Sequence, residues 1–155
     1  IENMFGRRAR PKICLSISAS LATASKPAAT YLLKLSLKNE GRAISQHYGF
    51  DFDFFGKLIV DSSQNRHRPG FSSPNIHSGL VTLKYRNLHD TDQRPLYPDE
   101  SIDISPNHSK LGHLMFTATD EQIENHAETV LKFKVYSENM LPQAGEIKFK
   151  DLFKK

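Results

Sequence analysis

The residues best suited to chemistry in this sequence are carboxylates, histidines and one cysteine, and their spacing decides what each could do. Asp51 and Asp53 stand two residues apart, a spacing that puts both on one face of a strand. Paired carboxylates can perform acid–base catalysis. Here they alternate with Phe50, Phe52 and Phe54, and this pattern favours the polar face of a half-buried strand over a catalytic pair.

Seven histidines are present, at spacings that do not suit one shared metal site. His108 and His113 are the closest pair, and a turn at Gly112 with Asp120 nearby would bring metal-ligand types together, but polar surface loops explain them better. The single cysteine, Cys14, excludes an intrachain disulfide and a cysteine-based zinc site. It lies in an alternating apolar run, which favours a packed structural thiol over a nucleophile. We therefore predict neither metal nor cofactor.

Motifs that mark well-known catalytic geometries do not occur. The sequence contains no phosphate-binding glycine loop, no G-x-S-x-G nucleophile elbow, no H-E-x-x-H and no EF-hand loop. Each of these motifs reflects a backbone geometry that other residues rarely reproduce. The sequence therefore predicts a protein with no catalytic residues, which is not an enzyme.

Basic residues cluster near the two ends and in one polar segment. The formal net charge is +4 and the isoelectric point is about 9.2. Solvated tails explain such clusters, and so does contact with nucleic acid or another anionic surface. The candidate interaction surface predicted from these clusters consists of Arg7, Arg8, Arg10, Arg66, His67 and Arg68.

Strict alternation of apolar and polar residues recurs along the chain and predicts short strands. Two sheets packed face to face would bury the apolar residues and leave Lys, Ser and Asp in water. The sequence therefore predicts an all-β, antiparallel, immunoglobulin-like sandwich of about eight short strands with at most one short helix. The predicted strands cover residues 13–21, 31–38, 50–55 with 57–61, 80–85, 101–105, 114–118, 130–136 and 146–150.

The segments between these strands carry turn and loop residues. Ser62–Ser78 reads as a long exposed loop, and Ser137–Gly145 as a turn through Pro142. Thr119–Glu128 is the one candidate helical turn, with Thr119 as its cap. Residues 1–12 read as a basic lead-in or linker, and residues 13–155 as a single β-sandwich domain.

The sequence indicates the cellular compartment only through features that it lacks. A single cysteine fits a reducing compartment, so we predict a cytoplasmic protein. No stretch reaches the ~18 apolar residues of a membrane helix, so no membrane association is predicted. Because the sequence starts with Ile1 rather than Met, we expect it to be part of a longer protein.

Three passages together resemble a known group of domains. Leu37–Gly41, followed by Ala43, is similar to a strand end in bacterial immunoglobulin-like accessory domains, and Leu96–Ile104 resembles their turn-then-strand segment. Tyr136–Pro142, continuing to Gly145–Ile147, resembles the closing hairpin of domains that follow Schlafen-type AlbA_2 DNA-binding domains in bacterial proteins. The likeness covers about half of the chain and implies a C-terminal accessory sandwich of a larger regulatory protein. It carries no active-site residue.

Three hypotheses about function follow. The leading one is a non-enzymatic accessory module that mediates contact with a protein partner, or self-association, within a larger DNA-associated protein. The second is direct binding of nucleic acid through the basic clusters. The third is a sandwich that binds a small ligand or carbohydrate through the Ser62–Ser78 loop.

Overall fold

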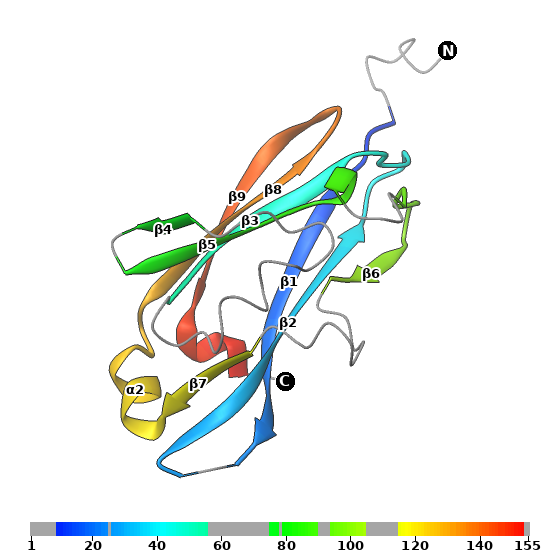
Figure 1. Ribbon diagram of the computed structural model, residues 1–155. Coiled ribbons are helices and arrows are strands. Elements are labelled where there is room, and N and C mark those ends of the chain that lie inside the picture. Colours follow the sequence, from blue (N-terminus) through cyan, green and yellow to red (C-terminus); the bar gives the residue numbers. More distant parts are fainter. Residues whose placement is uncertain are drawn as a thin grey trace.

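The computed structural model shows two antiparallel β-sheets packed face to face (Figure 1). The structure describes residues 9–24, 26–55, 75–77, 79–89, 94–104 and 115–153. The predicted all-β sandwich is confirmed: within the described ranges, strands dominate and α2 is the one α-helix.

The strands agree with most of the predicted alternating segments. They are β1 (Ile13–Thr23), β2 (Ala28–Asn39), β3 (Tyr48–Phe55), β4 (Asn75–His77), β5 (Leu80–Arg86), β6 (Ser101–Asp103), β7 (Met115–Thr119), β8 (Val130–Ser137) and β9 (Met140–Lys148). The helical segments are the 3-10 turns η2 (Asn87–His89) and η3 (Phe149–Phe153) and the α-helix α2 (Asp120–Asn125).

Each sheet is built around one long central strand. In the four-stranded sheet, β2 pairs on one side with β1 and on the other with both β6 and β7. In the five-stranded sheet the order is β4-β5-β3-β8-β9. β2 and β3 are therefore the strands that face each other through the centre of the molecule.

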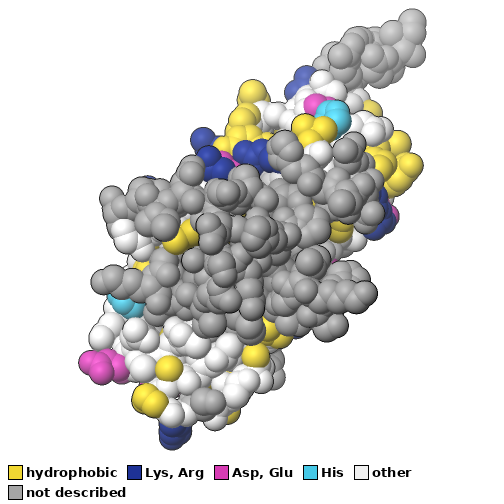
Figure 2. All heavy atoms as spheres, viewed as in Figure 1, with side chains coloured by type: hydrophobic (Ala, Val, Ile, Leu, Met, Phe, Trp, Pro, Cys, Tyr) yellow, Lys and Arg dark blue, Asp and Glu magenta, His cyan; other side chains and the backbone are white. Residues whose placement is uncertain are grey.

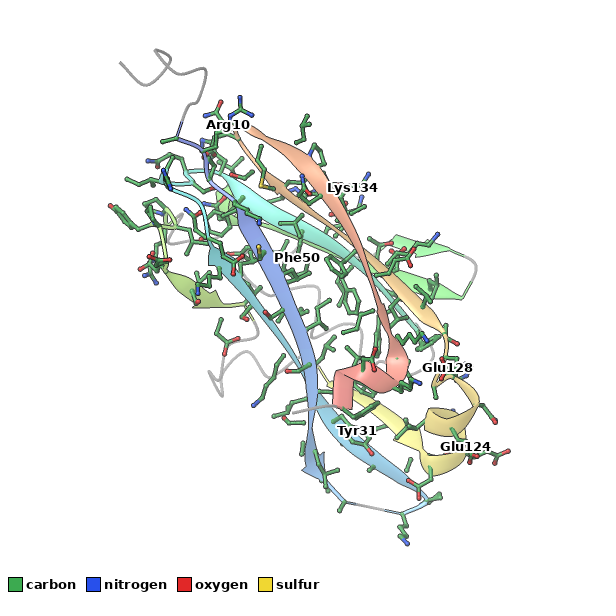
Figure 3. The ribbon with its side chains drawn as sticks, turned by 180° about the vertical axis from the view of Figure 1, so that it is seen from behind. Arg10, Tyr31, Phe50, Glu124, Glu128 and Lys134 are labelled. Carbon is green, nitrogen blue, oxygen red and sulfur yellow. The ribbon has the colours of Figure 1, made fainter. Side chains whose placement is uncertain are left out.

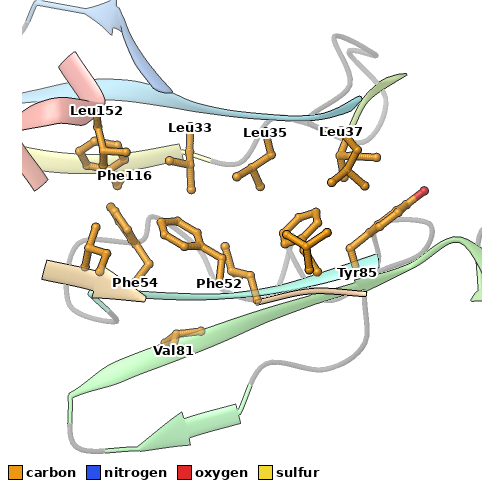
Figure 4. Close-up of a cluster of buried hydrophobic side chains, with 14 of the residues drawn as sticks. Leu33, Leu35, Leu37, Phe52, Phe54, Val81, Tyr85, Phe116 and Leu152 are labelled. Atoms are coloured by element: carbon orange, nitrogen blue, oxygen red, sulfur yellow. The ribbon is translucent and has the colours of Figure 1, made fainter. Parts of the chain in front are cut away.

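The core lies between β2 and β3, where every second residue of each strand directs a large apolar side chain inward (Figure 4). Leu35 and Leu37 of β2 face Phe50 and Phe52 of β3, and all four are fully buried. Asp51, between the phenylalanines, points to the opposite face of the sheet. The interpretation of the Phe–Asp alternation as a half-buried strand is confirmed.

One end of the core is closed by η3, where the sequence predicted that the last strand continues to residue 150. The strand ends at Lys148, and Phe149 turns inward as its N–H donates to the Thr129 carbonyl (2.9 Å). Phe149 and Leu152 are fully buried. The prediction is wrong here because closing an open sandwich end with an aromatic ring buries more apolar area than one further strand residue.

The hairpin between β8 and β9 is tighter than the sequence predicted. The predicted turn at Ser137–Gly145 is wrong: Glu138 and Asn139 form the turn, Asn139 with a φ of 59°, and β9 starts at Met140. Pro142 misled the prediction, because proline usually interrupts strands. β9 is the edge of its sheet, where a missing N–H costs no ladder hydrogen bond.

The predicted loop at Ser62–Ser78 contains a short strand. Residues 75–77 form β4, which pairs with β5, so the prediction is wrong at these three positions. A strand of this length has too few residues for alternation to stand out from its polar surroundings. The remainder of that loop, and the predicted strand at 57–61, lie outside the described residues.

The single predicted helical turn is confirmed as α2. Thr119 caps it, as expected: its side chain accepts from the Gln122 N–H (3.0 Å), and the Gln122 side chain accepts from the Thr119 N–H (2.9 Å). None of the helices in the described ranges is long and apolar enough to cross a membrane.

Replacing Phe54 tests the importance of the aromatic core. Phe54 is fully buried, with ring centroids 5.0 Å from Phe116 and 6.2 Å from Phe149. Phe54→Ala should lower the free energy of unfolding by about 3–5 kcal/mol, because the cavity cannot collapse between two sheets. Urea denaturation followed by circular dichroism measures it. The control Leu141→Ala, at a side chain that is 80% exposed, should stay within about 0.5 kcal/mol, and an equal effect of both variants would contradict this account.

Candidate functional site

Several connections meet at one end of the sandwich, which we call the loop end. They are the described lead-in residues 9–12, residues 40–47 between β2 and β3, η2, residues 94–100, and the β8–β9 turn (Figure 1). Hydrogen bonds join them: Ser45 and Leu96 exchange backbone bonds of 2.9 and 2.8 Å, and the Glu138 N–H donates to the His47 carbonyl (3.2 Å). The loop end is therefore one connected surface.

A buried asparagine fixes much of the loop end. Asn39 is fully buried at the end of β2. Its Oδ1 accepts from the backbone N–H groups of Lys12 (3.1 Å) and Gly41 (2.9 Å). Its Nδ2 donates to the carbonyls of Ala43 (2.8 Å) and Leu96 (3.0 Å). Because the buried Asn39 amide makes all four of these bonds, it holds the lead-in and two loops in one arrangement.

Arg10 is the one residue of the predicted interaction surface that the structure describes. Its carbonyl accepts from the N–H groups of Arg42 (2.9 Å) and Ala43 (3.3 Å), and its side chain is exposed at the loop end (Figure 3). Gly41 permits this contact, because a Cβ there would overlap with the Arg10 carbonyl oxygen. The other predicted residues lie outside the described ranges: Arg7, Arg8, Arg66, His67 and Arg68.

Two carboxylates of the loop end, Glu138 and Glu100, bind neighbouring groups. Glu138 accepts from the N–H groups of Gln46 (2.8 Å) and His47 (2.5 Å). Glu100 forms an ion pair with Arg94. These two carboxylates therefore hold neighbouring loops in place through charge-assisted hydrogen bonds and an ion pair.

Three cations of the loop end lack such partners. Arg10, Lys12 and Arg42 are exposed, and none forms an ion pair with another residue in the described part of the chain. The exposed carboxylates Glu40 and Asp99 also belong to the loop end, so this surface offers a ligand charges of both signs.

Exposed apolar side chains gather at the same end. The exposed fractions are 80% for Leu141, 50% for Tyr97, 47% for Leu88 and 41% for Ile44. Figure 2 shows hydrophobic and basic side chains next to one another there. Leu141 is the second residue of β9 and the other three lie in connections, so the exposed apolar side chains of this end come from several segments of the chain.

A second polar arrangement lies on the outer face of the five-stranded sheet. Asp51 accepts a hydrogen bond from the Tyr136 hydroxyl (2.9 Å), and the Arg86 guanidinium lies 3.0 Å from its other oxygen. The same guanidinium is 4.4 Å from the centre of the Tyr136 ring. Sequence reasoning missed Arg86 and Tyr136, because only the register of β3 with β5 and β8 brings them to Asp51.

A shallow hollow of about 590 Å³ lies over this face. Lys132 and Lys134 line it, but so do Asp51, Asp53 and Glu146. Such mixed charge does not favour binding of a phosphate backbone on this face. Burial raises the pKa of the Tyr136 hydroxyl, and its hydrogen bond to Asp51 and the charge of that carboxylate raise it further.

Cys14, which the sequence predicts to be a packed structural thiol, lies on the outer face of the four-stranded sheet. It is partly exposed, and its thiol donates to a Glu40 carboxylate oxygen (3.1 Å). Burial raises its pKa, and the hydrogen bond to Glu40 adds to the effect, so the reactive thiolate is disfavoured. Among the described residues no group of His, Cys, Asp and Glu is placed to hold a metal ion, while His108 and His113 lie outside them.

Comparisons with known proteins find a distant likeness to solved structures. No protein-family model matches the chain, and no curated protein matches it. The structure is similar to part of a solved GH20 exo-β-N-acetylglucosaminidase from Vibrio harveyi in complex with N-acetylglucosamine, with a TM-score of 0.42 and 10% identity. The match covers 86% of this chain and 17% of that one.

The outer face yields a pH-dependent test. Asp51→Asn should lower the pKa of Tyr136, because the carboxylate that favours the neutral hydroxyl is removed and the Arg86 charge then favours the phenolate. Titration of ¹³C-labelled tyrosine by NMR measures this shift. Asp53→Asn is the matched control, since Asp53 accepts instead from Thr82 (2.6 Å) and should leave Tyr136 unchanged. An unchanged or raised pKa in Asp51→Asn would refute the contact.

Proposed function

We propose that this chain is a non-enzymatic interaction module that binds a protein partner through its loop end. The observation that carries this proposal is the group of four exposed apolar side chains at the loop end, where Asn39 and Glu138 hold the connections in place. A surface that is already ordered loses little conformational entropy on binding. Exposed aromatic and leucine side chains on such a surface are suitable anchors for a partner.

The chemistry of the loop end indicates the kind of partner. Leu141 and Tyr97 offer apolar contact, while Arg10, Lys12 and Arg42 carry positive charge without ion-pair partners among the described residues. A peptide segment with apolar side chains flanked by carboxylates would complement both features. We therefore expect an acidic, amphipathic partner.

We further propose that the module is an immunoglobulin-like accessory domain of a larger, DNA-associated regulatory protein in the cytoplasm. The support is the sequence resemblance to domains that follow Schlafen-type AlbA_2 domains. Its passages Leu37–Gly41 and Tyr136–Pro142 contribute Asn39 and Glu138, which organise the loop end. The same surface would then be the one presented to the rest of the assembly.

Selection of peptides from a random library tests the binding surface directly. The chain is immobilised and random peptides displayed on phage are selected against it. We expect enriched sequences that combine Leu, Ile or aromatic residues with Asp and Glu. Leu141→Glu should weaken their binding by about tenfold or more, because it removes the most exposed apolar anchor and adds a repelling charge.

Val130→Glu is the matched control, since Val130 is also an exposed apolar residue (42%) but starts β8, away from the loop end. It should leave peptide affinity unchanged. Peptides that bind Leu141→Glu as tightly as the unchanged chain, or that lose affinity equally in both variants, would overturn the proposal.

Nucleic-acid binding is a second candidate, favoured by the same three cations. Arg10 and Arg42 are joined through their backbones, so the basic lead-in continues onto the folded domain. If DNA is the ligand, fluorescence anisotropy should show affinity that falls steeply with salt and falls again in Arg10→Ala/Arg42→Ala. Leu141→Ala should leave it unchanged. Absence of binding at low salt would exclude this candidate.

A further inference from the structure

β1 is an edge strand of unusual composition. It lies at the border of the four-stranded sheet, and within the described part of the chain β2 is the one strand that pairs with it. Its eleven residues, ICLSISASLAT, include no charge, proline or glycine. Natural sheets normally protect an edge with such residues, because unpaired backbone groups are a template for another strand.

The hydrogen-bond register shows which backbone groups of β1 face outward. The Lys12 carbonyl accepts from the Glu40 N–H (2.8 Å), so Ile13 and Asn39 form a non-hydrogen-bonded pair of the ladder. Odd-numbered residues of β1 therefore direct their N–H and C=O groups away from β2. The Ile13 N–H reaches the Met140 sulfur (3.4 Å). The corresponding groups of the following odd residues have no partner among the described residues: Leu15, Ile17, Ala19 and Leu21.

The side chains of the same residues leave apolar area along this edge. Leu15, Ile17 and Ala19 pack against the core yet are only partly buried, and Leu21 is 56% exposed. The even-numbered side chains on the outer face are small, among them Ser16 and Ser18. Within the described part of the chain, a strand placed beside β1 would thus meet free backbone groups, an apolar strip toward the core, where η3 and β8 also contact β1, and small side chains on the outer face.

The edge strand β9 of the five-stranded sheet differs from β1 in proline content, in charge and in the regularity of its pairing. β9 carries Pro142, which cannot donate, and the charged residues Glu146 and Lys148. Its pairing with β8 is also shifted between Val135 and Ser137. These are the devices that prevent edge-to-edge pairing. Among the residues that the structure describes, the β9 edge is therefore protected by such devices, whereas the β1 edge carries none of them.

We propose that two copies of this chain associate by antiparallel pairing of β1 with β1, around a two-fold axis beside Ser18, which makes one eight-stranded sheet. A second copy fits this edge because identical antiparallel strands are self-complementary and an uncharged strand brings no like charges together. Leu15 would lie opposite Leu21, and Ile17 opposite Ala19. This inference uses a surface distinct from the loop end and is independent of the proposed function.

Sedimentation equilibrium of the complete chain tests the association. Between about 1 μM and 1 mM, the average mass should rise from the 17.6 kDa of the monomer toward twice that value. Ser18→Lys should weaken dimerisation by about tenfold or more, because it places two ammonium groups opposite each other across the axis. Ser36→Lys is the matched control, on the same sheet face but in the central strand β2, and should not affect dimerisation. Circular dichroism checks that both variants fold.

Disulfide trapping tests the register directly. In the double variant Cys14→Ser/Ser18→Cys, the two new thiols would face each other across the axis and oxidation should give a covalent dimer. Cys14→Ser/Ser36→Cys should stay monomeric under the same oxidation. Leu141→Glu should leave dimerisation intact, so failure of the loop-end proposal and failure of this one are distinguishable. A monomer at every concentration, equal trapping at both positions, or a dimer that Ser18→Lys does not weaken would overturn the inference.

Discussion

The remaining structure depends on one constraint: the leucines of β2 must face the phenylalanines of β3 across the core. Leu35 and Phe52 are fully buried from opposite sheets, and Asp51 and Asp53 occupy the alternate positions of β3. A shift of β3 by one residue would turn both carboxylates into the core, so the register has no near-equal alternative. The same alternation brings Asp51 to Arg86 and Tyr136 on the outer face. Core packing and outer-face chemistry are thus two results of one register.

Asn39 connects the packed strands of the core to the loop end. It is the last residue of β2, and its buried amide bonds the lead-in at Lys12 and the loop at Leu96. Its position is set by the strand, so the connections that it bonds take a fixed position relative to the sheets. These hydrogen bonds join the connections into one surface, on which the exposed apolar side chains lie at one end of the sandwich.

The alternation of apolar and polar residues predicted most of the strands. Features that depend on which strands pair could not be predicted from it. The apolar face of β3 and the cap at Thr119 followed from local residue patterns, and both are confirmed. The start of β9 did not, because Pro142 reads as a turn residue unless the strand is known to be an edge. The Asp51–Arg86–Tyr136 arrangement joins residues 35 and 85 positions apart, information that only strand pairing supplies. The place of Arg10 beside the loop end likewise depends on contacts far apart in sequence.

The two proposed surfaces together constrain how an assembly could be arranged. The loop end lies at the Ile13 end of β1, since Lys12 is bonded to Asn39 there. Antiparallel pairing of β1 with its copy would therefore place one loop end at each extremity of the dimer, facing opposite ways. Eleven residues of strand extend about 36 Å, so two sites on one partner would have to lie several nanometres apart to be engaged together. Such a dimer would therefore link two separate partner molecules. Its two loop ends lie too far apart to bind two neighbouring sites on one partner at the same time.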